Sequence, residues 1–80
     1  MSRSSRTKAR IRGFVLDELA EGKPSRDPLA DGLLDSLAIG QLVAFCEEEF
    51  GISLDDGDVT AERFESLDAV TALVESKRAP

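Results

Sequence analysis

Residues 36–50 carry the feature that most constrains the fold of this chain of 80 residues. Their apolar side chains recur every three or four positions, which is the spacing of one face of an α-helix. Asp35 and Ser36, at the start of this stripe, are both favoured N-cap residues, and Gly51 suits the left-handed position that ends many helices. The pattern therefore predicts a helix over 36–50 with one buried face. The residues of that face are Ile39, Leu42, Val43, Cys46 and Phe50.

The other side of this predicted helix carries a second stripe. At roughly 100° per residue, every member of this stripe points almost directly away from the buried face. The members are Leu37, Gln41, Ala44 and Glu48. Leu37 is therefore predicted to be an apolar side chain that faces solvent within one turn of Ser36.

Ser36 has two interpretations. The simpler one is that its hydroxyl only caps the helix, as serine commonly does. The other starts from the free N–H groups and the positive end of the helix dipole, which favour a phosphate group at this place. The chain has no His and its single Cys is predicted to be buried, so nothing would activate Ser36 as a nucleophile. Ser36 is therefore a better acceptor of a group attached by another enzyme than a catalytic residue.

The rest of the chain reads as helices and loops, without a strand pattern. A first helix is expected over 7–20, a short one over 60–64, and a last helix that begins after the N-cap residue Ser66. A long connection over 21–34 and a solvated Asp-rich loop over 51–58 join them. The prediction is an all-α fold, a small bundle of three main helices and one short helix. The expected buried positions are Ile11, Phe14, Val15 and Leu19 in the first helix and Leu67, Val70, Leu73 and Val74 in the last.

Composition limits the class of protein. The length corresponds to one domain, which we place at 7–80 after a disordered basic tail at 1–6. With one Cys and no His, neither an intrachain disulfide nor a zinc site is expected. No apolar run reaches the roughly 18 residues of a membrane span, and the basic N-terminus lacks the apolar segment of a secretory signal. Together these features predict a cytoplasmic protein with no membrane partner.

Charge is distributed unevenly along the chain. From Gly13 onward, five cations stand against sixteen acids, a balance of −11, which should repel nucleic acid and attract basic protein surfaces. The acids at 47–49 oppose the helix dipole, so they serve either solubility or the docking of a basic partner. The basic tail is expected to be solvated, with contact to nucleic acid or acidic lipid as the alternative. The five cations before Gly13 are Arg3, Arg6, Lys8, Arg10 and Arg12.

Three segments carry a family resemblance. They are 31–37 (Asp-Gly-Leu-Leu-Asp-Ser-Leu), 47–52 (Glu-Glu-Glu-Phe-Gly-Ile) and 64–70 (Phe-Glu-Ser-Leu-Asp-Ala-Val). In these segments the chain resembles the acyl and peptidyl carrier protein family, and the resemblance covers about residues 11–75. It implies a carrier-protein-like four-helix bundle that is monomeric and has no catalytic residue or metal of its own.

The resemblance also implies a chemistry centred on Ser36. A phosphopantetheinyl transferase would use magnesium to move 4'-phosphopantetheine from coenzyme A to the Ser36 oxygen, and the thiol of this arm would hold cargo as a thioester. The partners would be that transferase, an adenylation or acyltransferase loading enzyme, and downstream condensation or tailoring enzymes. Asp35 would assist recognition by the transferase, and Leu37 would belong to the docking face. We extend this predicted partner interface along the second stripe to Gln41, Ala44 and Glu48.

One departure from the family bears on the cargo. Carriers of fatty acid synthesis usually have acidic residues early in the second helix, where this chain has Ala38 and Gln41. The departure favours a carrier of aminoacyl, peptidyl or D-alanyl groups, most simply in nonribosomal peptide biosynthesis. With no adjoining domain in the sequence, such a carrier is expected to be free-standing. An acyl carrier protein of fatty acid or polyketide synthesis is the alternative, and a helical interaction module without an arm is a further one. A hydrolase using Ser36 would lack a base, and a nucleic-acid binder would need its cations on the folded body.

Overall fold

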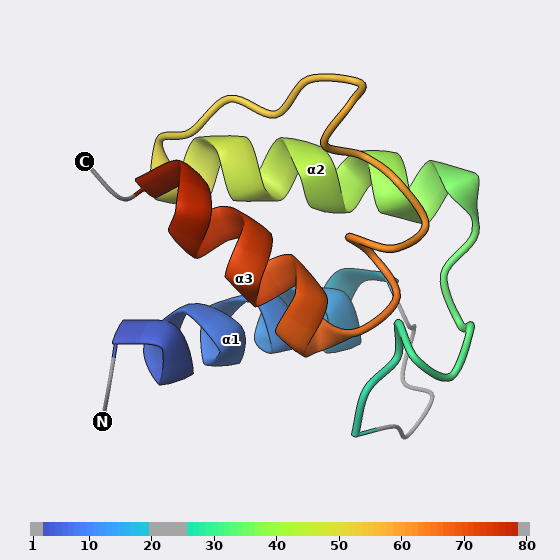
Figure 1. Ribbon diagram of the computed structural model, residues 1–80. Coiled ribbons are helices and arrows are strands. Elements are labelled where there is room, and N and C mark those ends of the chain that lie inside the picture. The colour runs from blue at the N-terminus through green and yellow to red at the C-terminus, as the bar shows by residue number, and fades with distance from the viewer. Residues whose placement is uncertain (1–2, 20–25, 79–80) are drawn as a thin grey trace.

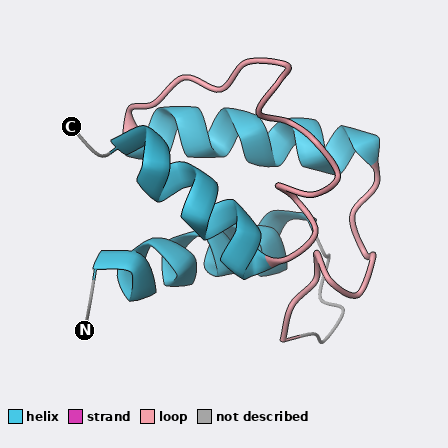
Figure 2. Cartoon of the chain, in the orientation of Figure 1, coloured by secondary structure: helices cyan, strands magenta, loops and turns pink. Residues whose placement is uncertain are grey.

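The computed structural model describes residues 3–19 and 26–78. Within these ranges the chain is helical and contains no strand, so the predicted all-α class is confirmed (Figure 2). The elements are α1 (Arg3–Phe14), which continues directly as the π-helix η1 (Val15–Leu19), α2 (Ser36–Phe50) and α3 (Leu67–Arg78).

The three α-helices are arranged with α3 between the other two. Figure 1 shows α1 along one side of the molecule, α2 along the opposite side, and α3 crossing between them. α1 and α3 run in opposite directions: the start of α1 is paired with the far half of α3, and the start of α3 is paired with the middle of α1. Arg3 Nε lies 2.9 Å from Glu75 Oε1, and Lys8 Nζ lies 2.9 Å from Asp68 Oδ1.

The core is one cluster drawn from all three α-helices, η1 and two loop residues. All four predicted positions of α3 are buried in it, which confirms the apolar spacing read from the sequence. In α2 the predicted face is fully buried only at Leu42 and Cys46, and its other members are half-buried at the edge of the cluster. The two loop residues are Leu29 and Phe64. The cluster consists of Ile11, Val15, Leu29, Leu42, Cys46, Phe64, Leu67, Val70, Leu73 and Val74.

The predicted disordered tail is wrong for Arg3–Arg6, which belong to α1; Met1 and Ser2 lie outside the described residues. α1 begins four residues before the predicted start at Thr7, and the predicted helix end at Ala20 also falls outside the described residues. Contacts with α3 explain the early start. Thr7 is buried, and its Oγ1 donates a hydrogen bond to Glu75 Oε2 at 3.1 Å. Tertiary contacts of this kind supply most of the stability of short helices.

The predicted short helix over 60–64 is wrong, because residues 61–64 form a turn. Thr60 holds this turn: its carbonyl oxygen accepts from Phe64 N at 3.1 Å, and its Oγ1 accepts from Arg63 N at 3.3 Å. One hydrogen-bonded turn does not overcome the cost of starting a helix. Burial of the Phe64 ring in the core holds the segment in place instead.

Asp27 ties the long connection to the start of α3. Its carboxylate accepts from Ala30 N at 3.1 Å and from Leu67 N at 3.1 and 3.2 Å. Ser66 Oγ accepts from Ala69 N at 3.0 Å, so the predicted N-cap of the last helix is confirmed. Two side-chain acceptors thus satisfy N–H groups in the first turn of α3 that have no partner inside the helix.

The two glycines of α2 should respond to alanine in opposite directions. Gly51 has a φ of 65°, the predicted left-handed ending, where an alanine costs about 1–2 kcal/mol. Gly40 lies in the helix interior, and a Cβ there would meet no atom within 4 Å, so alanine should add up to about 1 kcal/mol. Urea unfolding of Gly40→Ala and Gly51→Ala beside the parent chain measures both. A Gly51→Ala variant as stable as the parent would contradict the left-handed ending.

Candidate functional site

Asp35, not Ser36, caps the N-terminus of α2. Asp35 has an extended backbone, with φ −91° and ψ −176°, and its Oδ1 accepts from Ala38 N at 2.8 Å. Its carbonyl oxygen accepts from Ile39 N at 2.9 Å. The simpler interpretation of Ser36 is therefore wrong: Ser36 is the first residue of the helix, and its side chain is exposed rather than used as a cap.

The surroundings of Ser36 suit a group that is attached to it. At a helix start the first N–H groups and the dipole attract negative charge. Asp35 accepts from the N–H groups of Ala38 and Ile39, and the N–H groups of Ser36 and Leu37 come before these in the helix. No imidazole exists in the chain to activate the hydroxyl. The single thiol, Cys46, is buried as predicted, and burial, with a smaller effect of the Glu47 charge, raises its pKa to about 12.

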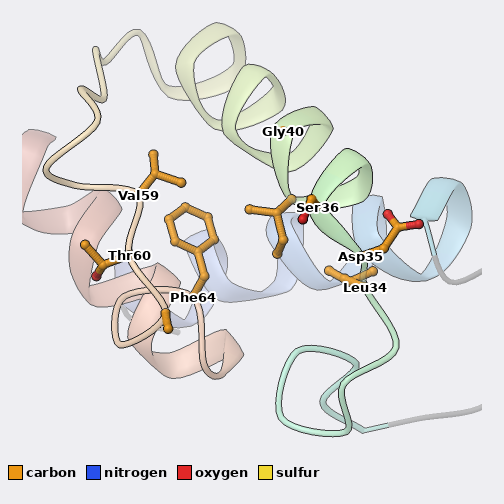
Figure 3. A pocket seen from close by; sticks show the side chains of 9 residues that line it. Leu34, Asp35, Ser36, Gly40, Val59, Thr60 and Phe64 are labelled. Atoms are coloured by element: carbon orange, nitrogen blue, oxygen red, sulfur yellow. The ribbon is translucent and has the colours of Figure 1, made fainter.

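A groove opens beside Ser36, between the start of α2 and residues 59–64 (Figure 3). Its volume is about 700 Å³. Ile39 belongs to the α2 side, and Val59 and the Phe64 ring form the facing wall, so the lining is mainly apolar. Figure 3 shows Ser36 at the edge of this groove and Asp35 on the side away from Val59 and Phe64. The Ser36 hydroxyl therefore lies between the N-terminus of α2 and the apolar groove.

Asp58 anchors the loop that leads to the facing wall. Asp55 and Asp58 each accept from the other's N–H at 3.1 Å, and Asp58 Oδ2 lies 2.9 Å from Lys77 Nζ. The prediction that Asp58 points into solvent is wrong, because its side chain is only 17% exposed. The hydrogen bond from Lys77, followed by the bond from backbone N–H, lowers the pKa of Asp58. Among the described residues, no group of carboxylates or other ligands is arranged to hold a metal ion.

Two of the three acids at 47–49 have roles inside the molecule. Glu47 Oε2 accepts from Leu54 N at 2.8 Å, and Glu49 Oε2 lies 3.0 Å from Arg10 NH2. These contacts hold the loop after α2 and the helix α1 against α2. Glu47 and Glu49 therefore have structural roles, whereas the sequence had suggested only solubility or the docking of a basic partner. Glu48, between them, is exposed and belongs to the second stripe.

The second stripe of α2 is exposed over its whole length, as predicted. Leu37 is 72% exposed, and among the described residues no other large apolar side chain is exposed. It directly follows Ser36, so an enzyme acting on the hydroxyl would meet this side chain. The members are Leu37, Gln41, Ala44 and Glu48.

A second, shallower hollow of about 470 Å³ adjoins this stripe. It lies between α2 and the end of α1, with Glu48 and Glu18 among its lining residues. The Phe14 and Phe45 rings also line it and are stacked on each other, with centroids 4.1 Å apart and an interplanar angle of 9°. Phe45 was not predicted from the sequence, because it lies between the two stripes of α2 and its partner is on another helix.

Comparison with known proteins does not assign the chain to a family. No protein-family model matches it, and no curated protein matches it. The carrier-protein resemblance therefore depends on the three sequence segments and stays a prediction. The structure brings Asp35, Ser36 and Leu37 together at the start of α2, with the other predicted interface residues further along the same helix. None of the described helices has the length and apolar character needed to cross a bilayer.

Alanine substitutions at the start of α2 should separate the cap from the hydroxyl. Asp35→Ala removes the acceptor of Ala38 N–H and should destabilise the fold by about 1 kcal/mol. Ser36→Ala changes an exposed side chain and should alter stability by less than about 0.5 kcal/mol. Thermal and urea unfolding of both variants measure the difference. An equal decrease in the free energy of unfolding in the two variants would indicate that Ser36 also caps the helix.

The contribution of Asp58 to stability should vanish in acid. Its folded-state pKa lies below the ordinary 3.8, so the contribution is present above that pH and is lost as pH falls through the folded pKa. Urea unfolding should find Asp58→Asn less stable than the parent chain at about pH 7, and this difference should shrink as the pH falls below 3.8. The exposed neighbour gives a matched control, since Asp56→Asn should follow the parent throughout. A deficit of Asp58→Asn that persists undiminished near pH 2 would contradict this assignment.

Proposed function

We propose that this chain is a carrier protein. Its Ser36 would accept a 4'-phosphopantetheine arm, and the arm would carry an aminoacyl, peptidyl or acyl group as a thioester between separate enzymes in the cytoplasm. In the carrier-type four-helix arrangement, the turn over 61–64 takes the place of the short third helix. The observation that carries the proposal is the exposed hydroxyl of Ser36, free of any capping role, at the edge of an apolar groove.

The attachment divides its work between this chain and a phosphopantetheinyl transferase. The new bond joins Ser36 Oγ to the phosphorus that bears pantetheine, and the bond from that phosphorus to the adenosine bisphosphate part of coenzyme A breaks. The hydroxyl proton would leave to a base on the transferase, because this chain contains no His and the neighbouring Asp35 is engaged as the helix cap. The residues of this chain present the hydroxyl: Asp35 fixes the first turn of α2, and the start of the helix favours the resulting phosphate.

The interface proposed for the enzymes is the second stripe of α2. An exposed Leu37 beside the reacting hydroxyl offers apolar area, and Glu48 at the far end offers charge to a basic partner. The transferase, the loading enzyme and the downstream condensation or tailoring enzymes would bind here in turn. The carrier would act as a monomer, with catalysis supplied by these partners.

Two observations bear on the cargo, and they favour different classes. Ala38 and Gln41 leave the start of α2 without the acids usual in fatty acid carriers, which favours aminoacyl or peptidyl cargo. The groove beside Ser36 favours the alternative, an acyl chain of fatty acid or polyketide synthesis, because Ile39, Val59 and Phe64 offer it an apolar lining. We retain the first as the proposal.

Intact-protein mass spectrometry tests the proposal. The purified chain is incubated with coenzyme A, magnesium and a phosphopantetheinyl transferase of broad specificity. We expect a mass increase of one phosphopantetheine in the parent chain and none in Ser36→Ala, which should remain folded because Ser36 is not the cap. Ser53→Ala is a matched control that removes another exposed serine hydroxyl, and it should be modified like the parent.

The possible outcomes are distinct. An unmodified, well-folded parent chain would contradict the carrier proposal and favour the alternative of a helical interaction module without an arm. Modification of Ser36→Ala would place the arm on another residue. Once the modified chain is in hand, adenylation enzymes with amino acids and a malonyl transferase with malonyl coenzyme A are compared as loading systems. Malonyl loading without aminoacyl loading would overturn the choice of cargo while leaving the carrier role intact.

A further inference from the structure

A cluster of arginines lies at the end of the molecule away from Ser36. α2 begins at Ser36 and ends at Phe50, so its two ends are about 22 Å apart at 1.5 Å per residue. At the Phe50 end, the start of α1 and the end of α3 meet (Figure 1). A hollow of about 340 Å³ opens here. Its cationic residues are Arg3, Arg6, Arg10 and Arg78.

We propose that this hollow binds a phosphate group carrying two or more negative charges. The site is separate from Ser36 and does not depend on the carrier function. It comprises Arg3, Arg6 and Arg10, which lie three and four positions apart on one face of α1, and Arg78 at the end of α3. These are four of the ten cations in a chain whose net charge is −6.

Contacts within the protein hold three of the four guanidinium groups in place. Arg3 Nε donates to Glu75 Oε1 at 2.9 Å. Arg78 NH1 donates to Thr7 Oγ1 at 3.1 Å, and the same guanidinium lies 5.3 Å from the centre of the Phe50 ring. Such contacts reduce the side-chain entropy that a ligand would otherwise have to overcome.

Arg10 is held in the same way. Its Nε and NH2 lie 3.2 and 3.0 Å from Glu49 Oε2, and its guanidinium carbon lies 5.8 Å from the centre of the Phe45 ring. In each of these three arginines, the contacts occupy one or two of the three guanidinium nitrogens. Each side chain therefore retains N–H groups for an incoming anion.

The charge of the cluster exceeds what the protein neutralises. Among the residues that the structure describes, four arginines face two carboxylates, Glu49 and Glu75, which leaves a local balance of +2. Arg6 has no ion pair or hydrogen bond from its side chain within the described part of the chain, and it lies between Arg3 and Arg10 on the α1 face. An anion with two charges would balance the cluster and supply the partner that Arg6 lacks.

The donor geometry favours phosphate. Guanidinium groups bind phosphate and carboxylate oxygens through pairs of parallel hydrogen bonds, and several forks around one hollow suit a compact anion with several oxygens. An acidic peptide would lay its carboxylates along an extended surface, and the rest of this acidic molecule would repel it. The phosphate could belong to a soluble compound or to a lipid headgroup, which share this chemistry.

NMR titration with sodium pyrophosphate tests the site. The unmodified chain and its Ser36→Ala variant are titrated at constant ionic strength, and the arginine Nε–H resonances are followed. We expect the resonances of the four clustered arginines to shift together and to the same extent in both proteins. Arg6→Gln should weaken pyrophosphate binding by about fivefold, the upper end for an exposed ion pair.

The matched control is Arg63→Gln, which removes the same charge from an exposed residue in the turn that follows Thr60. It should bind pyrophosphate like the parent chain, and circular dichroism of both variants checks their fold. Equal weakening in the two variants would overturn the site, since it would show a response to net charge alone. Shifts no larger than those caused by added chloride would overturn it as well.

Two further probes identify the source of the phosphate. Vesicles of phosphatidic acid in phosphatidylcholine are compared with phosphatidylcholine alone by flotation. Arg6-dependent binding to the acidic vesicles assigns the site to a headgroup, whereas pyrophosphate binding without vesicle binding assigns it to a soluble phosphate compound. A poly-glutamate peptide that binds through Arg6 more tightly than pyrophosphate would overturn the proposal in favour of an acidic protein partner.

Discussion

The carboxylate of Asp27 is the contact on which the arrangement of the site depends. It closes a turn of the long connection by accepting from Ala30 N, and it accepts from Leu67 N, forty positions further along the chain. One side chain thus fixes both the loop that leads to α2 and the first turn of α3. Leu29 is packed in the core, so the short segment between Asp27 and the start of α2 is held at one end. The position of the Ser36 hydroxyl follows from a contact made far from it in sequence.

Much of the fold could be predicted from the sequence, because periodic burial is a local property. The buried face of α3 and the left-handed glycine at position 51 were both predicted correctly. The early start of α1 could not be predicted, since Arg3 and Thr7 are held by Glu75 at the other end of the chain. The turn over 61–64 was missed for a similar reason: a segment this short, with Phe64 as its large apolar residue, does not reveal whether core packing or helix formation decides its shape.

The bounds of α2 were predicted correctly, but the residue that caps its start was not. Both Asp35 and Ser36 have side chains that cap helices, and only the backbone angles decide which of them does so. The exposure of Leu37 followed from helical geometry, and the structure confirms it. The roles of Glu47 and Asp58 depend on partners elsewhere in the fold. The sequence therefore did not show that these two acids hold the loop beside the groove.

The burial of Cys46 has a practical consequence for thiol chemistry. A thiol with a pKa of about 12 and no exposed surface gives almost no thiolate to a disulfide reagent at neutral pH. The folded chain should therefore be silent in a colorimetric thiol count, and the unfolded chain should give one thiol. An attached phosphopantetheine would add a thiol that is visible without unfolding. Counting thiols before and after denaturation would then distinguish a chain with a free arm from a chain that has no arm or whose arm is acylated.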